Sequence, residues 1–201
     1  LMNGDYYVAM GDSITVGSGD DDHSDGYGYE PILDGLLTSG KGVSHIVANQ
    51  GVSGDTAADG VAIVSQLISY HPDAEFFLIL YGSNDAIASI PSGVGLNPGD
   101  SGYHGSYKEN MEYIVSFLRN AGIKPYLSKV PYNAGQCPTC DPFLQEYNQV
   151  INELVSKYGI AVNPPNFYKH FKNNPGELID KLHPNGAGYR SMAALWYDAL
   201  K

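Results

Sequence analysis

The chain has 201 residues, of which 43% are hydrophobic and 16% charged, a composition typical of a globular protein and unlike that of a disordered one. This length accommodates one hydrophobic core, and we expect residues 1–201 to form a single domain. Acidic side chains outnumber basic ones by 22 to 11, and the resulting net charge of -11 disfavours nucleic acid and anionic lipid as partners.

The hydrophobic runs are short. The longest, such as residues 76–81, fall far below the roughly 20 residues that a transmembrane helix requires, so we expect no transmembrane segment. Cys137 and Cys140, the prolines and glycines around them and the low lysine content favour a protein exported to the periplasm or the extracellular space. These signals leave the compartment open.

Segments with strand character alternate along the chain with longer amphipathic segments. This order is typical of a parallel sheet covered by helices on both faces. The strand-like segments are rich in β-branched and aromatic residues. The pattern predicts an α/β fold, a three-layer α/β/α sandwich with a five-stranded parallel sheet, whose strands lie at residues 6–10, 44–48, 76–81, 124–130 and 160–162.

Helical periodicity and helix-ending glycines define the segments between these strands. A helix is expected to start near Asp55, where Asp55 and Thr56 can cap it, and Gly122 and Gly159 close two later ones. The other predicted helices cover residues 29–37, 107–120, 142–157 and 186–200. Residues 89–105 carry glycines and prolines without periodicity, which predicts a surface excursion.

Polar or glycine-rich turns follow the first three predicted strands. Ser13 ends the run Gly11-Asp12-Ser13, glycines lie at 51 and 54, and residues 82–85 read Gly-Ser-Asn-Asp. In an open parallel sheet, ligands bind beyond the carboxyl ends of the strands. We therefore expect these turns to meet at one edge of the sheet and to form the functional site.

Ser13 has a candidate base far downstream. A serine hydroxyl becomes a good nucleophile only when a neighbouring imidazole takes its proton. In Asp180-Lys181-Leu182-His183 the aspartate lies three residues before the histidine, so its carboxylate can accept the Nδ1 hydrogen and leave Nε2 free as the base. The sequence thus predicts a Ser13, His183 and Asp180 constellation, provided that the His183 loop reaches the same edge of the sheet.

Together these segments resemble the GDSL or SGNH hydrolase family of serine esterases and lipases. Four blocks occur in the family's order: Gly11-Asp12-Ser13-Ile14, Asn49-Gln50-Gly51-Val52-Ser53-Gly54-Asp55-Thr56, Gly82-Ser83-Asn84-Asp85 and Asp180-Lys181-Leu182-His183-Pro184. Ile14 replaces the leucine of the family name and leaves the nucleophile unchanged. Residues 53–56 match the family's Ser-Gly-Asp-Thr segment, so Gly54, rather than Gly51, is the counterpart of the glycine in the family's second motif.

The resemblance implies an SGNH-hydrolase, flavodoxin-like fold and a carboxylic ester hydrolase that acts through an acyl-enzyme on Ser13. We expect short- to medium-chain acyl esters as substrates, because the domain has little extra sequence with which to build a lid. The backbone N–H groups of Ser13 and Gly54 and the side-chain amide of Asn84 would form the oxyanion hole. We expect a small-molecule acyl ester as the partner and no cofactor or metal ion. The oligomeric state stays open. The Gly-x-Ser-x-Gly string of α/β-hydrolases does not occur.

Other activities fit the same residues. A carbohydrate acetylesterase, a lysophospholipase or thioesterase and an acyltransferase would use the same site, and the sequence does not separate them. Cys137-Pro138-Thr139-Cys140, placed after a predicted strand and before a helix, is compatible with a thiol–disulfide oxidoreductase or with a local disulfide. The acidic run at residues 20–25 lacks the residue spacing of an EF-hand, so we expect a solvated loop there.

Overall fold

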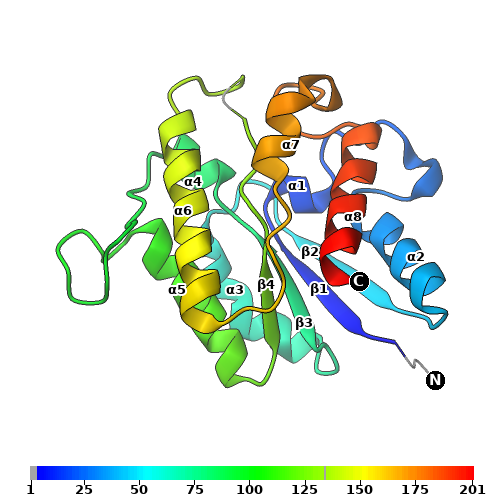
Figure 1. Cartoon of the computed structure of the whole chain (residues 1–201), viewed down its shortest axis with the longest axis horizontal. Helices are drawn as coiled ribbons and strands as arrows, with labels where there is room; N and C mark the ends of the chain where they lie inside the picture. The colour runs from blue at the N-terminus through cyan, green and yellow to red at the C-terminus, as the bar shows by residue number, and fades with distance from the viewer. Residues whose placement is uncertain (1–3, 134) are drawn as a thin grey trace.

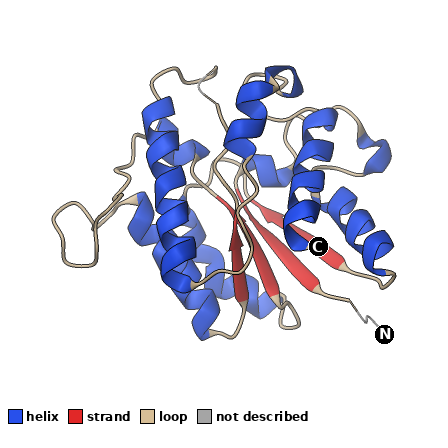
Figure 2. Ribbon diagram, viewed as in Figure 1, coloured by secondary structure: helices blue, strands red, loops and turns tan. Residues whose placement is uncertain are grey.

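A parallel β-sheet runs through the molecule, with helices packed on both of its faces (Figure 1, Figure 2). The computed structural model describes residues 4–133 and 135–201. The strands are β1 (Tyr6–Gly11), β2 (Ile46–Gly51), β3 (Phe76–Leu80) and β4 (Lys124–Leu127). The helices are α1 (Ser13–Val16), α2 (Glu30–Lys41), α3 (Ala57–Tyr70), α4 (Ser83–Ile87), α5 (Tyr107–Asn120), α6 (Asp141–Tyr158), α7 (Phe167–Asn173) and α8 (Gly186–Leu200), with 3-10 turns η1 (His23–Asp25) and η2 (Pro175–Glu177).

The strand order β2-β1-β3-β4 and the register of the pairing bring three loops to one edge of the sheet. All neighbouring strands pair in parallel. Gly11 at the end of β1 pairs with Gly51 of β2 and with Leu80 of β3, so these three strands end at the same level. The turns that follow them therefore start side by side, as the sequence predicted.

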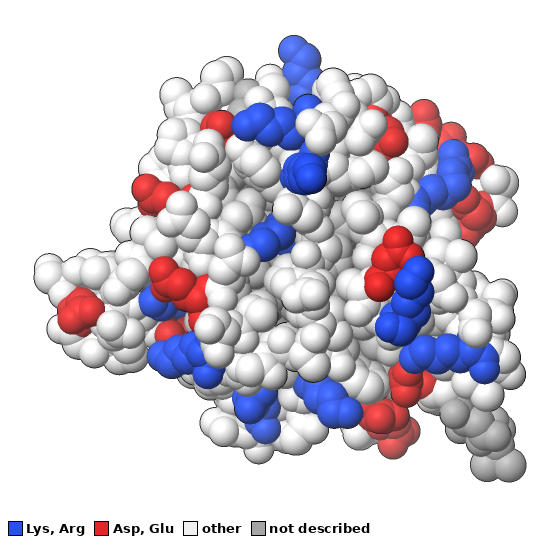
Figure 3. Space-filling view, in the orientation of Figure 1, with Lys and Arg blue, Asp and Glu red and all other residues white. Residues whose placement is uncertain are grey.

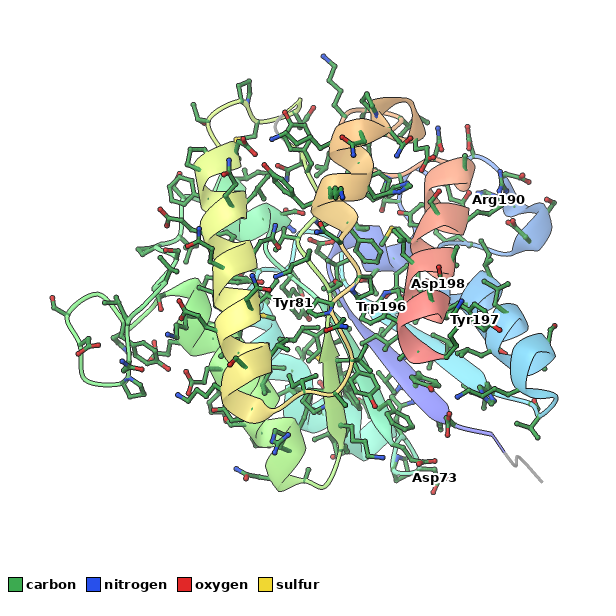
Figure 4. The ribbon with its side chains drawn as sticks, in the orientation of Figure 1. Asp73, Tyr81, Arg190, Trp196, Tyr197 and Asp198 are labelled. Atoms are coloured by element: carbon green, nitrogen blue, oxygen red, sulfur yellow. A yellow bond between two sulfur atoms is a disulfide. The ribbon has the colours of Figure 1, made fainter. Side chains whose placement is uncertain are left out.

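Alternate residues of the strands face two separate helical layers. Val8 and Met10 of β1 belong to one buried cluster, together with side chains of α3, α5 and α6. Tyr7 and Ala9 belong to the other, with side chains of α2, α7 and α8; Trp196 of α8, labelled in Figure 4, is fully buried there. This alternation is the period of two that a strand imposes on its side chains. The predicted α/β/α sandwich is confirmed.

The predicted fifth strand at residues 160–162 is wrong, and the sheet has four strands within residues 4–133 and 135–201. Gly159 ends α6 in a left-handed conformation, and the N–H of Ile160 donates to the carbonyl of Val155 in the last turn of that helix, 3.0 Å away. The backbone that a strand would pair is thus used to cap a helix. At the edge of the sheet, the N–H of Lys129 donates instead to the carbonyl of Pro165.

Strand and helix ends follow local hydrogen bonding. β4 stops at Leu127, short of the predicted residue 130, because the N–H of Val130 donates to the side chain of Asn148. The predictions for residues 107–120 and 186–200 are confirmed by α5 and α8. α3 starts at Ala57, where Thr56 and Asp59 form a reciprocal capping box. The short helices α1, α4 and α7 were not predicted.

Two further features concern the chain outside the sheet. Cys137 and Cys140 form a disulfide just before α6, and Cys140 is almost completely buried. Residues 89–105 have no helix or strand and project beside α5, away from α1 (Figure 1). Within the described residues, no helix is both long enough and apolar enough to cross a membrane.

Candidate active site

The end of β1 and the start of α1 place Ser13. Asp12 caps α1 by accepting a hydrogen bond from the N–H of Ile14 at 2.9 Å, which makes Ser13 the first residue of this helix. The helix lies against the end of β2, where a Cβ atom on Gly51 would come within 2.5 Å of the backbone nitrogen of Val16. A glycine at this position therefore allows the helix that carries Ser13 to approach the sheet edge.

The loop that carries His183 is held in shape by Asp180. Its Oδ1 atom accepts hydrogen bonds from the N–H groups of Leu182, at 3.0 Å, and of His183, at 2.7 Å. Leu178 and Pro184 form an isolated bridge that closes the loop. Lys181 at its tip takes a left-handed conformation with φ of 70°, which a non-glycine residue adopts at a cost.

Ser13, His183 and Asp180 form one chain of hydrogen bonds. The Oγ atom of Ser13 lies 2.9 Å from Nε2 of His183, although the two residues are 170 positions apart in the sequence. The Nδ1 atom of His183 lies 2.7 Å from Oδ2 of Asp180. The side chain of His183 is 21% exposed and that of Asp180 is 47% exposed, so the constellation opens to solvent.

The electrostatics of Asp180 suit an acceptor that stays ionised. Its partial burial acts to raise the pKa, but the hydrogen bonds from the backbone and ring of His183 and from the N–H of Leu182 outweigh burial, and the pKa lies below its usual value. An ionised carboxylate accepts the Nδ1 hydrogen and favours the tautomer in which Nε2 has a free lone pair. That lone pair faces the hydroxyl of Ser13.

The side chain of Asn84 is hydrogen-bonded to the backbone next to Gly54. Asn84 lies in α4, which follows β3, and its Nδ2 atom donates to the carbonyl of Asp55 at 2.9 Å. Gly54 precedes that residue and has a φ of 91°, in the left-handed region that favours glycine. Apart from Gly54 itself and its two chain neighbours, no atom of the described residues lies within 4 Å of the position that a Cβ on Gly54 would take, so this side of the residue is open. The Asn84 amide keeps a second N–H for another acceptor.

Two buried carboxyl groups lie beneath these turns. Asp85 is completely buried and accepts hydrogen bonds from the N–H of Ala57 at the start of α3, and burial raises its pKa to about 6. Burial also raises the pKa of Asp12 to about 7, and the negative charges of Asp85 and Asp55 act in the same direction. Their titration range could not be predicted from sequence, because it depends on burial.

Three exposed apolar side chains flank the candidate residues and were not singled out from the sequence. Val52 lies two residues before Gly54, Ile87 ends the helix of Asn84, and Ile179 precedes Asp180. Each is about half exposed, at 46%, 49% and 57%. Exposed apolar side chains in the segments that carry site residues can offer contact area to the apolar part of a ligand. Their proximity in sequence to the four blocks is the signal that could have identified them.

The acidic run after α1 is not the purely solvated loop expected from its charges. Asp20 is 8% exposed and accepts a hydrogen bond from the N–H of Gly28 at 2.9 Å. Asp21 accepts one from the N–H of Gly186, the first residue of α8. In the part of the chain that the structure describes, no group of three or more His, Cys, Asp or Glu side chains has the arrangement of a metal site.

A serine, a histidine and an aspartate in this hydrogen-bond order, at the carboxyl edge of a parallel sheet, define a serine hydrolase type of site. The chain belongs to the GDSL-like Lipase/Acylhydrolase family, whose sequence pattern matches residues 9–191. It is 26% identical over 155 residues to an arylesterase of Vibrio mimicus; the match includes 75% of this chain and 66% of that protein, just under two thirds of its length.

Solved structures share the fold. An acetylxylan esterase from Geobacillus stearothermophilus is 20% identical, with a TM-score of 0.74 over 98% of this chain and 94% of that one. Catalytic mutants of the same enzyme, in which a serine, a histidine or an aspartate is changed to alanine, match similarly. An alpha/beta hydrolase enzyme from the metagenome of Lake Arreo is 20% identical, with a TM-score of 0.73 over 99% of this chain and 96% of that one.

Proposed function

We propose that this chain is a serine carboxylic ester hydrolase, formed by one domain over residues 1–201, that cleaves short- to medium-chain acyl esters through an acyl-enzyme on Ser13. The observation that carries the proposal is the 2.9 Å separation of the Ser13 Oγ and His183 Nε2 atoms. Membership in the GDSL-like Lipase/Acylhydrolase family supports the same reaction. The mechanism uses no cofactor or metal ion.

The reaction has two halves. The Oγ atom of Ser13 attacks the acyl carbon while Nε2 of His183 takes its proton, and the protonated imidazole then gives that proton to the departing alkoxide. The acyl group is left on Ser13. In the second half, His183 takes a proton from a water molecule that attacks the acyl-enzyme, and returns it to Ser13. Asp180 keeps the ring oriented and stabilises its charged form in both halves.

The tetrahedral intermediates carry negative charge on the former carbonyl oxygen. The donors for this oxyanion are the backbone N–H groups of Ser13 and Gly54 and the second N–H of the Asn84 amide. The hydrogen bond from Asn84 to the carbonyl of Asp55 supports this role, because it fixes the amide beside the Gly54 turn before substrate binds. The open space around Gly54 leaves room for the acyl oxygen.

The surroundings of the site favour a small acyl group on a larger alcohol. The constellation is open to solvent, and Val52, Ile87 and Ile179, which are exposed and lie within three residues of Gly54, Asn84 and Asp180 in the sequence, are the apolar side chains available for an acyl group. A carbohydrate acetylesterase is the second candidate, favoured by the fold shared with an acetylxylan esterase. Lysophospholipase, thioesterase and acyltransferase activities use the same acyl-enzyme and differ only in the leaving group or the acceptor.

The test combines substrate profiling with labelling. We expect the wild-type protein to hydrolyse 4-nitrophenyl acetate and butyrate faster than long-chain esters, and to be labelled by an organophosphonate on Ser13. Ser13→Ala should lose both the ester hydrolysis and the labelling. Acetylated xylan, lysophospholipid and competing alcohols then identify the natural class of substrate and acceptor. Hydrolysis by Ser13→Ala at the wild-type rate would contradict the proposal.

A further inference from the structure

The loop after α1 and the start of α8 lie close in the sequence to Ser13 and His183, the nucleophile and the base of the proposed reaction. The acidic loop, defined as residues 17–28, begins directly after the helix of Ser13, and α8 begins three residues after His183. Figure 1 shows this loop, in blue, beside the first turns of α8, in red. Contacts between the acidic loop and α8 can therefore influence the distance between Ser13 and His183, because only a few residues separate those contacts from each of the two side chains.

Hydrogen bonds join the acidic loop to the first turns of α8. The N–H of Gly186 donates to Oδ1 of Asp21 at 2.8 Å, and the hydroxyl of Tyr189 donates to the carbonyl of Ser18, also at 2.8 Å. The first N–H groups of a helix have no partner within it. Asp21 satisfies one of them from a distant part of the sequence, while Asn185, the N-cap, bonds to the N–H of Gly188.

An ion-pair network lies beside these hydrogen bonds. Nη1 of Arg190 in α8 lies 2.9 Å from a carboxylate oxygen of Asp22 and 3.0 Å from one of Asp25. Figure 4 labels Arg190 on α8 next to the acidic loop, and Figure 3 shows basic atoms between acidic ones in this region, at the upper right. Among the described residues, Arg190 is the one Lys or Arg side chain paired with this loop.

Arg190 also supplies the positive charge that Asp22 and Asp25 share. The loop holds four carboxyl groups, on Asp20, Asp21, Asp22 and Asp25. Hydrogen bonds from the hydroxyl and N–H of Ser24, followed by Arg190, lower the pKa of Asp22 to about 2, so this group stays ionised. Without the guanidinium, Asp22 and Asp25 would lose the positive charge that they share, and with it the two ion pairs that hold this part of the loop to α8.

The backbone of the acidic loop is in close contact with the segment from His183 to Gly186. A Cβ atom on Gly19 would lie 2.8 Å from the Cβ of His183 and 2.9 Å from the carbonyl oxygen of Pro184. A Cβ atom on Gly186 would lie 2.7 Å from the Cβ of Asp22. All three separations are shorter than atoms tolerate, so glycine at these positions lets the acidic loop lie directly against the loop of His183 and the start of α8.

We propose that the acidic loop is a clamp that holds the His183 imidazole against Ser13, with Asp21 and Arg190 as positioning residues. This inference rests on the proposed roles of Ser13 and His183. Neither Asp21 nor Arg190 contacts the substrate in this scheme. They act by fixing the backbone on the C-terminal side of His183, as Asp180 fixes it on the N-terminal side.

The size of the effect follows from exposure and geometry. The side chains of Arg190, Asp22 and Asp25 are 45%, 42% and 32% exposed, and an exposed ion pair alone contributes little to stability. Catalysis responds more strongly, because a displacement of about 1 Å at a reacting group can cost up to about 100-fold in rate. Partial release of the clamp should therefore lower kcat by about tenfold, which lies between no effect and the loss of about 100-fold expected for a full displacement of about 1 Å.

The first experiment compares Arg190→Gln, Arg190→Lys and wild type in 4-nitrophenyl acetate hydrolysis. Arg190→Gln should lower kcat about tenfold with less than a twofold change in KM, and Arg190→Lys should restore at least half of the lost rate. Lys201→Gln is the matched control, because it removes an ion pair with Asp198 at the other end of α8. Its kcat should equal that of the wild type. A wild-type kcat in Arg190→Gln would overturn the clamp.

Two further comparisons keep the test valid if Arg190→Gln fails to fold. Asp21→Asn keeps a carbonyl oxygen for the Gly186 N–H and should retain most of the activity, whereas Asp21→Ala should lose about as much as Arg190→Gln. Equal, undiminished activity of the two variants would refute the role of Asp21. In the wild-type protein, 1 M NaCl should lower kcat by screening the network, and an unchanged kcat would also count against the clamp.

Failure of the clamp can be told apart from failure of the proposed reaction. If Ser13→Ala is inactive while Arg190→Gln and Asp21→Ala behave as wild type, only the clamp is wrong. If Ser13→Ala retains wild-type hydrolysis, the proposed function is wrong, whatever the clamp variants do. A lower rate of Ser13 labelling by an organophosphonate in Arg190→Gln, with unchanged thermal stability, is the result expected for positioning.

Discussion

Asp180→Asn is the most informative change to this site, because it alters one hydrogen bond and keeps the shape of the side chain. Oδ1 of Asp180 accepts from the N–H groups of Leu182 and His183, and the amide oxygen of asparagine can do the same. The amide NH₂ would then face Nδ1 of His183 in place of Oδ2. The imidazole would turn to the tautomer with its hydrogen on Nε2, which cannot take the proton of Ser13.

The expected loss follows from the exposure of the pair. In an enclosed triad this substitution lowers turnover by about 10⁴, which corresponds to about 5.5 kcal/mol of transition-state stabilisation. Here Asp180 is 47% exposed and His183 is 21% exposed, so water can partly replace the lost charge interaction. We therefore expect kcat to fall by about 10² to 10³, or about 3 to 4 kcal/mol.

The assay is kcat and KM for 4-nitrophenyl acetate, with a thermal melt on the same samples. Asp180→Asn should melt within about 3 °C of the wild type because the loop keeps its backbone hydrogen bonds; a loss of about 1 kcal/mol produces a shift of this size in a domain of this length. Asp180→Ala, which also loses those bonds, serves as the comparison and should melt lower. If Asp180→Asn works within a factor of about three of the wild type, the proposed orienting role of Asp180 is wrong.

Three further predictions address the oxyanion donor, the buried carboxyls and the disulfide. Asn84→Ala should lower kcat by about 10² to 10³ with an unchanged circular dichroism spectrum, and a near-normal kcat would exclude Asn84 as a donor. The pKa of Asp12 is raised to about 7 and that of Asp85 to about 6, so the folded state binds more protons than the unfolded state above about pH 4. The contribution of these two groups to the unfolding free energy is therefore fully present below the pKa of an unfolded aspartate. It is lost as the pH rises through their pKa values in the folded state. Urea titrations should therefore give a lower unfolding free energy at pH 8 than at pH 5, and a slope equal to the wild type in Asp12→Asn would contradict this origin. Replacing Cys137 and Cys140 by serine opens a very short loop, which should cost about 2 kcal/mol of stability and leave kcat unchanged; a large loss of activity would require a role beyond bracing.

Short-range features were the ones that sequence reasoning predicted well. Helix periodicity and end signals act within a few residues, and the predicted bounds of α5 and α8 agree with the structure. The failed strand at residues 160–162 had only a short apolar run to support it. A strand requires a partner edge for its backbone, and here the N–H of Ile160 is already bonded to the preceding helix.

By itself, the sequence determined the layered α/β class, the four blocks that mark the family, and the local Asp180 to His183 pair, since each of these depends on residues near one another along the chain. Tertiary structure decided the rest. The register of three strands brings the blocks to one edge, and Ser13 meets His183 across 170 positions. The acidic loop looked solvated because its partner, Arg190, lies 165 positions beyond Asp25, and a charge pattern contains no information about which distant residue folds against it.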